Sequence, residues 1–432
     1  MANKKLRVLG ITCGIGSMLQ GAKMAGYKVV GNIEWRKYYH KKDEEGRNTF
    51  MANYPRAFFV EKMDDLTPEQ REDIKGVDLV MGHPECGNFS VLSKGSNAYR
   101  GIDKTGDAAD IPLFIDMIAE VQPRFFVMDD LPGCLGPFPM EEYQRRLPEY
   151  DLFPEWISNY HYGNVQKHRK RFFMIGALKS EKWAFQSGED PEYFGRVKDV
   201  IGDLCNRNGI PKKGIPNNDM NVLDDRKSPA IGLLGPGLPA TWKDVQEYFK
   251  GKEEGKVLEY HHRHDGSMRR KYGFSKSYWD KHGFVLTGGS SSPVHPLRNL
   301  PLNIRERARI QGFPDDFVFY GTRLEKNGKW DISRNNDLIK QTGKAMPIHF
   351  CRYVATLVAD HVTGRRKKQA KVTNQRCINP SEEIDLAKLW FCENIGYENQ
   401  EAACEACWLR KQCPTYHESR QEELFEAAGG ES

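Results

Sequence analysis

The 432-residue sequence lacks several features that would assign it to other classes of protein. No apolar run approaches the 18 residues of a membrane-spanning helix, so we expect no membrane segment. Residues 1–10, MANKKLRVLG, contain no hydrophobic signal-peptide core, which favours a cytoplasmic protein. No internal repeat is present, which argues against a solenoid or propeller. The ten cysteines do not form a disulfide framework, because five of them lie within the last 56 residues.

The chain does have enough apolar residues, 39%, for a sizeable core, and its charge is unevenly distributed. Residues 377–432 contain 12 acidic and 4 basic side chains, a net charge of −8, which leaves +13 on residues 1–376. A solvated surface can carry such a surplus, but a body this basic also suits a polyanion such as nucleic acid. The segment GRRKKQAK, residues 364–371, is interpreted as a basic linker that can contact phosphates.

Short apolar runs predict buried strands, separated by helical or loop stretches. The five runs are residues 6–11, 28–35, 77–82, 124–130 and 171–178. Strands that alternate with helices predict a parallel sheet, with ligands bound at the carboxyl ends of the strands.

Residues 179–290 break this alternation, since they are rich in Gly, Pro, Asn, Lys and Trp, and they predict an inserted irregular domain. Helical patterns return from about residue 296, in NIRERARIQGF and then in MPIHFCRYVATLVADHV.

A glycine turn, TCGIGS at 12–17, follows the first predicted strand, and Glu34 ends the second. Glycines let the backbone approach a nucleotide-like ligand, and a carboxylate there can hold ribose hydroxyls. Taken alone, the pattern fits a tight turn without a ligand equally well.

A single cysteine lies in the polar turn GHPECGNFSVLS, residues 82–93, directly after a predicted strand. A structural cysteine would be expected inside the apolar run. A thiol exposed in the turn after a strand can instead act as a nucleophile. Cys86 is therefore a candidate nucleophile, with a structural thiol as the alternative.

Six segments, in order, resemble motifs of the DNA (cytosine-5) methyltransferase family between about residues 6 and 361. After the glycine turn they are PECGNFS (84–90), DDLPG (129–133), RKRFFMIG (169–176), RERARIQGFPDDF (305–317) and TGKAMP (342–347). The resemblance implies an α/β fold with a Rossmann-like sheet, S-adenosylmethionine as donor and cytosine in double-stranded DNA as substrate. We expect a monomer with a catalytic domain (1–178 and 296–364), a target-recognition domain (179–295), a linker (365–376) and a C-terminal domain (377–432).

The resemblance also implies roles for four residues in the reaction. Carbon 5 of cytosine is a poor nucleophile until a thiolate adds at C6, and Cys86 occupies the position of that thiolate. The base must be flipped out of the helix to reach it. Asp129 occupies the position of the glutamate that holds N3 and the exocyclic amine. Arg169 and Arg171 match the arginines that hold phosphate and the base oxygen.

Donor binding is implied for the turns that follow the strands, with Trp35 stacking on adenine. The residues concerned are Gly14, Ile15, Gly16, Glu34, Trp35, Pro84 and Lys344.

Several positions depart from the family pattern around the base and the donor, and QKHRKR is one residue longer than the family's Gln-x-Arg-x-Arg. The departures are Lys62 for Asp, Glu85 for Pro, Gly87 for Gln, Asp129 for Glu, Asp130 for Asn and Lys344 for Asn. They indicate either a divergent enzyme or a different base or donor.

A lysine at position 344 would place a cation near the donor sulfonium. It can turn to a phosphate or to a carboxylate such as Asp129 or Glu85. Alternatively, it can pair with a carboxylated donor, carboxy-S-adenosylmethionine, whose product would be 5-carboxymethylcytosine. A third hypothesis is a non-catalytic, metal-sensing DNA-binding protein, although the retained Cys86 argues against it.

The C-terminal cysteines show the spacing C-x26-C-x2-C-x5-C, and the segment resembles WhiB-like iron–sulfur proteins over about 50 residues. That resemblance implies a [4Fe–4S] cluster, with zinc as the alternative ligand and unligated buried thiols as a third hypothesis. Cys392 is interpreted as a packed thiol. The expected ligands are Cys377, Cys404, Cys407 and Cys413.

Overall fold

The computed structural model describes most of the chain up to residue 365. The described ranges are 5–35, 45–85, 110–135, 138–166, 169–185, 195–218, 241–264, 267–287, 293–321, 325–326, 329–330 and 336–365. Cys86, Gly87 and the segment 366–432, with the four predicted metal ligands, lie outside these ranges.

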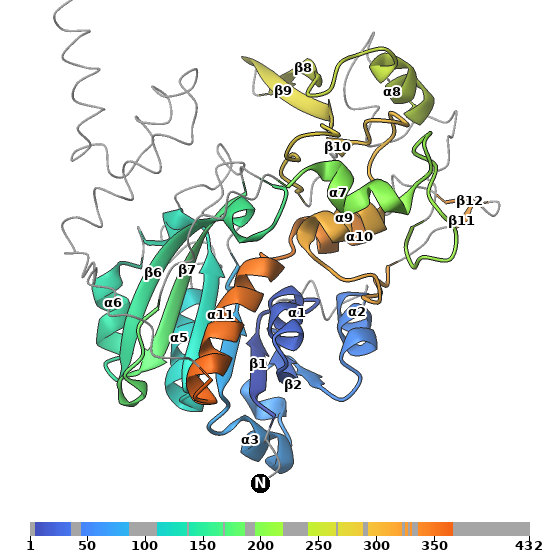
Figure 1. Cartoon of the computed structure of the whole chain (residues 1–432). Helices are drawn as coiled ribbons and strands as arrows, with labels where there is room; N and C mark the ends of the chain where they lie inside the picture. The colour runs from blue at the N-terminus through green and yellow to red at the C-terminus, as the bar shows by residue number, and fades with distance from the viewer. Residues whose placement is uncertain are drawn as a thin grey trace, which may run out of the picture.

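A seven-stranded sheet, in the order β3-β2-β1-β4-β5-β7-β6, forms the larger part of the fold (Figure 1). All five predicted strands are present: β1 Arg7–Ile11, β2 Lys28–Ile33, β4 Leu79–Gly82, β5 Phe125–Asp130 and β7 Lys170–Leu178. Two edge strands were not predicted, β3 Phe58–Val60 and β6 Tyr150–Ser158. β3 has only three residues, and β6 contains Pro154, which an edge strand tolerates.

The sheet is mixed, so the prediction of a parallel sheet holds for five of its strands and not for β7 and β6. β7 runs antiparallel to both of its neighbours, β5 and β6, while β3, β2, β1, β4 and β5 are parallel. Only residues 159–169 separate β6 from β7. A parallel pairing of consecutive strands needs a longer crossover, usually with a helix, and this connection is too short for one.

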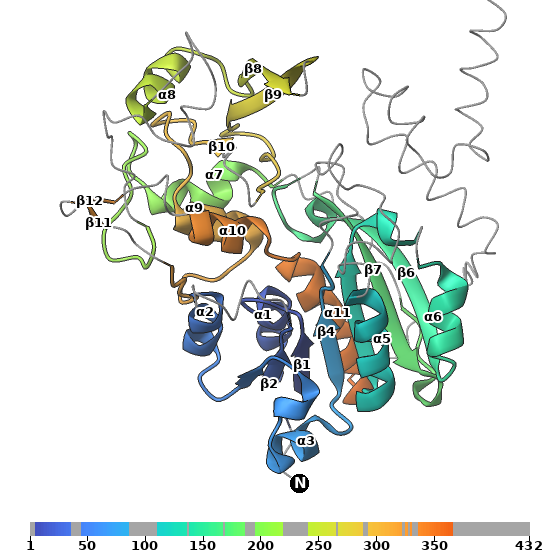
Figure 2. The same cartoon turned by 180° about the vertical axis from the view of Figure 1, so that it is seen from behind.

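Strand side chains alternate between two apolar cores, one on each face of the sheet. In β5, Phe125 and Val127 join one core, and Phe126 and Met128 join the other. Helices α1 and α11 cover the first face, and α5 covers the second (Figures 1 and 2). The helices around this sheet are α1 Ser17–Met24, α2 Glu45–Asn53, α3 Pro68–Ile74, α5 Asp110–Val121, α6 Met140–Arg146 and α11 Ile348–Val362.

Gly21 allows α1 and α11 to pack closely. A Cβ at this position would lie 2.7 Å from both the Arg352 nitrogen and the Ile348 oxygen. Because these are backbone atoms of α11, they cannot turn aside as a flexible side chain would. The contact places the first turn of α11 against the middle of α1.

The elements between β7 and α11 form a second part, which lies above the large sheet in Figure 1. A three-stranded sheet has the order β10-β9-β8. The bounds are α7 Val197–Ile201, α8 Trp242–Phe249, β8 Val257–His264, β9 Ser267–Lys276, β10 Pro293–Val294, α9 Ile304–Gln311, β11 Glu325–Lys326, β12 Lys329–Trp330 and α10 Asn336–Gly343.

Helices α9 and α11 confirm the two helical patterns predicted after residue 296. Asn303 caps the start of α9, where its side chain accepts from the Glu306 amide, and Gly312, which has a φ of +100°, caps its end. Short 3-10 helices complete the described elements, at Met63–Asp65, Pro132–Leu135, Asn159–Tyr162, Lys179–Glu181 and Gly202–Leu204. In the part of the chain described here, no helix combines the length and apolarity needed to cross a membrane.

Candidate active site

The predicted site residues that the structure describes gather at one edge of the large sheet. The parallel strands β1, β2, β4 and β5 end at this edge, and β7 begins there because it runs in the opposite direction. Residues that follow the four parallel strands therefore meet the first residues of β7. The carboxyl edge of such a sheet is where ligands of this fold class bind.

The glycine turn after β1 encloses the carboxylate of Glu34. The Gly14 amide donates to Glu34 Oε2 at 2.7 Å, and Glu34 is fully buried. Gly14 and Gly16 have φ values of +57° and +86°, which favour glycine. A Cβ on Gly16 would lie 2.5 Å from the Tyr54 ring. This close backbone cradle beside a carboxylate fits a nucleoside-type ligand.

Ile15 lies in the same turn but its side chain is buried in the core. Any contact with the donor would therefore involve its backbone. Ser17 connects this turn to the later motif TGKAMP, because the Ser17 Oγ accepts a hydrogen bond from the Met346 amide at 3.0 Å. Two predicted donor-binding segments, some 330 positions apart, thus lie side by side.

Asp110, at the start of α5, links the donor side to the turn that leads to Cys86. Its Oδ1 accepts from the Trp35 indole nitrogen at 2.9 Å, and its Oδ2 accepts from the Glu85 amide at 3.3 Å. Pro84 is buried beside Glu85. Sequence reasoning missed Asp110, because nothing in the pattern of α5 separates this residue from an ordinary acidic first-turn residue.

Asp129, His83 and Arg171 form a buried cluster at the ends of β5, β4 and β7. Arg171 donates from Nε to Asp129 Oδ1 at 2.9 Å and from Nη2 to Asp129 Oδ2 at 2.5 Å. His83 Nδ1 lies 2.9 Å from Asp129 Oδ2. Burial alone would raise the pKa of Asp129, but Arg171 and His83 outweigh it and hold that pKa below its ordinary value. Asp129 is therefore an ionised carboxylate.

Sequence reasoning also missed His83, although it lies within the turn that drew attention to Cys86. A histidine directly after a buried strand, three positions before a candidate nucleophile, was the available signal.

Arg169 and Arg171 point to different partners although they are two positions apart. Arg169 donates to the carbonyl oxygens of Leu286 at 2.7 Å and Ala345 at 2.6 Å, and to Gly343 at 3.3 Å. These bonds tie the beginning of β7 to the turn between α10 and α11. In this structure Arg169 thus fixes backbone segments, while Arg171 belongs to the carboxylate cluster.

Lys344 lies in that same turn, and its Nζ is 3.9 Å from Glu85 Oε2. Both positions depart from the family pattern described above. The negative charge of Glu85 offsets the lysine, as in one of the alternatives considered from sequence. The structure therefore gives no reason to require an anionic donor.

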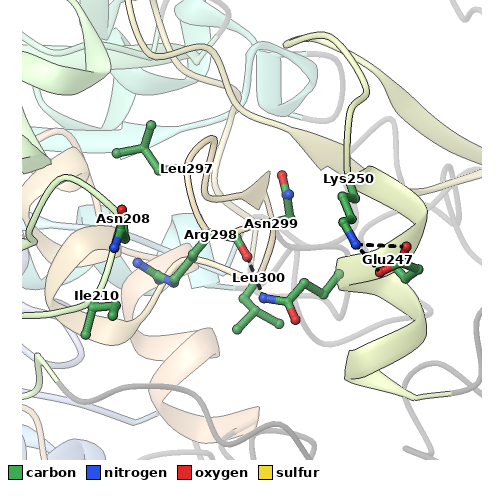
Figure 3. A pocket seen from close by; sticks show the side chains of 9 residues that line it. Asn208, Ile210, Glu247, Lys250, Leu297, Arg298, Asn299 and Leu300 are labelled. Carbon is green, nitrogen blue, oxygen red and sulfur yellow. Dashed lines mark hydrogen bonds and ion pairs between the residues drawn. The ribbon is translucent and has the colours of Figure 1, made fainter.

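A cavity of about 420 Å³ lies in the second part of the fold (Figure 3). Its polar groups bond to one another: Lys250 contacts Glu247, and Gln246 Nε2 donates to the Arg298 oxygen at 2.9 Å. The lining residues are Asn208, Ile210, Gln246, Glu247, Lys250, Leu297, Arg298, Asn299 and Leu300. None of the predicted site residues is among them, so the cavity does not belong to the candidate active site.

Metal ligation is not visible in the part of the chain that is described, where no group of three or more His, Cys, Asp or Glu side chains could hold an ion. The four cysteines predicted as ligands lie outside the described residues, and so does Cys86.

Comparison with known proteins shows that the chain is similar to DNA methyltransferases. The family described as C-5 cytosine-specific DNA methylase matches residues 6–359. The chain is 24% identical over 378 residues to the type II methyltransferase M.MthTI of Methanothermobacter thermautotrophicus, covering 81% of this chain and 96% of that protein. It is 26% identical over 387 residues to M.NgoPII of Neisseria gonorrhoeae, covering 82% and 95%.

Among solved structures, the fold is similar to that of the Entamoeba histolytica methyltransferase EhMeth. The TM-score is 0.52 at 13% identity, over 84% of this chain and all of that one. The family match ends at residue 359, so it gives no support to the resemblance of residues 377–432 to WhiB-like proteins.

Proposed function

The chain belongs to the family of C-5 cytosine-specific DNA methylases, and from this premise we propose how its residues divide the work of the reaction. The enzyme transfers a methyl group from S-adenosylmethionine to C5 of cytosine in DNA. We propose duplex DNA as the substrate, with the target base flipped out of the helix to reach the strand ends.

Cys86 is the proposed nucleophile. Its thiolate adds to C6 and makes C5 enamine-like, so that C5 can attack the donor methyl group. Cys86 immediately follows Glu85, whose amide is held by Asp110 at the edge where the strands end. The placement of Glu85 supports delivery of the thiol to this edge.

The cytosine is proposed to bind against the cluster of Asp129 and Arg171. The observation that carries this proposal is the bidentate pair of hydrogen bonds from Arg171 to Asp129, which is buried at the carboxyl end of β5. A guanidinium held rigidly by a carboxylate can present its remaining hydrogen-bonding capacity to a base oxygen. Arg169 supports the site by fixing the turn that contains Ala345.

The donor is proposed to lie along the glycine turn, where its ribose and adenine would meet Glu34 and Trp35. S-adenosylmethionine supplies an electrophilic methyl group when bound. The residues of this chain that would hold it are Gly14, Ile15, Gly16, Glu34, Trp35, Pro84 and Lys344. The cradle closed by Gly14 and Glu34 supports this placement.

Two further assignments rest on the sequence. We propose that residues 179–295 recognise the DNA target, since this insertion adds no strand to the catalytic sheet among the described residues. We also propose that residues 377–432 bind a [4Fe–4S] cluster through Cys377, Cys404, Cys407 and Cys413, and the cysteine spacing supports this.

The experiment incubates the full-length protein with S-adenosylmethionine and unmethylated genomic DNA, then analyses the nucleosides by mass spectrometry. We expect 5-methylcytosine with the wild type and with Cys134→Ala, which removes a buried thiol of the core. Cys86→Ser should give none, yet still bind DNA, because the thiolate acts in the chemical step. Near-normal methylation by Cys86→Ser would refute the nucleophile assignment. DNA binding by a wild type that methylates nothing would favour the non-catalytic alternative.

A further inference from the structure

His83 connects the turn that leads to Cys86 with the carboxylate of Asp129. It follows β4 directly and is almost fully buried. Its Nδ1 lies 2.9 Å from Asp129 Oδ2 and 3.0 Å from the Asp129 main-chain oxygen. Two of its three polar neighbours are acceptors and the third, the donor Arg171 Nη2, is farther away at 3.3 Å, so Nδ1 is assigned the hydrogen. In this neutral tautomer Nε2 carries no hydrogen and can only accept a hydrogen bond. It becomes a donor when the imidazole is protonated.

Asp129 is poorly suited to give a proton to the base. Its Oδ1 accepts from Arg171 Nε, and its Oδ2 accepts from both Arg171 Nη2 and His83. A carboxylate that accepts three hydrogen bonds, two of them from a guanidinium, is stabilised in its ionised form and can only accept. Its side chain is also one methylene shorter than the glutamate of the family pattern. Protonation of the base therefore requires another group.

The charged groups around His83 have opposite signs. Asp129, from β5, favours the protonated imidazole, whereas Arg171, from β7, opposes it, since Nη2 lies 3.3 Å from Nδ1. Burial, and secondly the charge of Asp129, raise the pKa of the Cys351 thiol, from α11, well above its ordinary value and keep it neutral. Imidazole is the side chain that ordinarily changes charge between pH 5 and 8.

We infer that His83 is a catalytic acid, which donates its Nε2 proton to N3 of the flipped cytosine while Cys86 adds to C6. This inference rests on the proposed function. It also gives the Asp129 carboxylate a defined task, which is to hold the imidazole by Nδ1 and to stabilise its protonated form.

The addition makes one bond to carbon and moves two π pairs. The C6–S bond forms, the C5–C6 π pair moves to C4–C5, and the N3–C4 π pair moves onto N3, which takes the proton from Nε2. In the transfer, C5 bonds to the methyl carbon and the electron pair of the broken bond stays on the donor sulfur. The N3–C4 double bond re-forms and the proton returns to Nε2. Water then removes the C5 proton as the C6–S bond breaks, which restores the thiolate.

The test is a pH profile of single-turnover methylation on unmethylated genomic DNA, with the full chain saturated in S-adenosylmethionine. In the wild type the rate should fall on the alkaline side, where His83 loses its proton. His83→Ala should lower the rate by about 100-fold to 10,000-fold at neutral pH, the usual range for a general acid. His83→Gln, which keeps a neutral N–H donor at a similar reach, should recover part of that loss and show no alkaline fall.

His361→Gln is the control, because this histidine of α11 contacts Glu181, outside the candidate site. Its profile should match the wild type. Rates within about threefold of the wild type for His83→Ala, or an unchanged alkaline fall in His83→Gln, would overturn the inference. A structural role alone would lower the rate equally at every pH. If Cys86→Ser still methylated DNA, the assignment of Cys86 as nucleophile would fail, and that outcome is separate from these.

Discussion

Lys344 Nζ lies 3.9 Å from Glu85 Oε2, so two residues that depart from the family pattern contact each other. Glu85 stands immediately before Cys86, and Lys344 lies in the turn that approaches the start of α1. The two departures compensate electrostatically, since each charge offsets the other. An unpaired lysine near a sulfonium would disfavour donor binding, and the pairing lowers that penalty.

Exchanging the two charges should test this pairing. We expect Glu85→Lys, which leaves two cations near the donor sulfonium, to weaken S-adenosylmethionine binding, and the double variant with Lys344→Glu, which restores a pair of opposite charges, to recover part of the loss. The side chains are 27% and 49% exposed, so their coupling should be about 0.2–1 kcal/mol. Calorimetric titration of the donor measures it.

Lys344→Asn should give only the methyl product when S-adenosylmethionine and carboxy-S-adenosylmethionine compete, and so should the wild type. A 5-carboxymethylcytosine signal would contradict this.

Asp129→Asn should strongly destabilise the fold, because it leaves the buried Arg171 guanidinium without its carboxylate. Loss of one partner of a buried ion pair costs about 3–5 kcal/mol. Asp116→Asn is a matched control, since Asp116 pairs with Arg146 at 3.0 Å but is 65% exposed. That change should cost less than about 1 kcal/mol. Urea unfolding compares the two variants, and equal losses would show that the Asp129 pair adds nothing.

The same aspartate should contribute to the pH dependence of stability. Its folded-state pKa is below the ordinary value, so its contribution is fully present above the unfolded-state pKa of about 3.9. It is lost as the pH falls through the lower folded-state pKa. The stability difference between the wild type and Asp129→Asn should therefore shrink once the pH falls below about 3.9. Urea unfolding at several pH values measures this, and a difference that grows in acid would refute it.

Gly21→Ala should separate α1 from α11. The added Cβ would meet backbone atoms of Arg352 and Ile348 at 2.7 Å, and such overpacking typically costs about 1–3 kcal/mol. The control is Gly202→Ala, whose Cβ would meet the Trp279 ring at 3.5 Å, an ordinary contact. Gly202 also has a φ of −65°, which alanine adopts readily. Thermal unfolding should show a clear loss for the first variant only, and an unchanged midpoint for Gly21→Ala would mean that the helices adjust freely.

The C-terminal cysteines should give a brown protein after anaerobic purification, with about four iron and four sulfide per chain. Cys404→Ser and Cys407→Ser should bleach it, because the thiolates are the proposed ligands. Cys392→Ser is the control and should keep the colour. Visible spectra with iron and sulfide analysis decide the matter, and stoichiometric zinc without visible absorption would exclude the cluster.

The sequence by itself determined the elements whose signal is local. Five continuous apolar runs became strands β1, β2, β4, β5 and β7, because a strand buried on both faces needs apolar side chains at every position. Helices α9 and α11 were likewise readable, since caps, glycines and helical periodicity act within a few residues of each other.

The tertiary structure decided which way β7 runs and which side chains meet. The residues of a strand do not specify the direction in which it runs in the sheet. The direction of β7 depended on its short connection from β6. The cluster of His83, Asp129 and Arg171 joins residues 46 and 42 positions apart. The Glu85–Lys344 contact spans a still longer separation. Such pairings depend on the packing of whole elements against one another, so sequence could name Asp129 and Arg171 through a resemblance, while only the folded chain brought His83 to them.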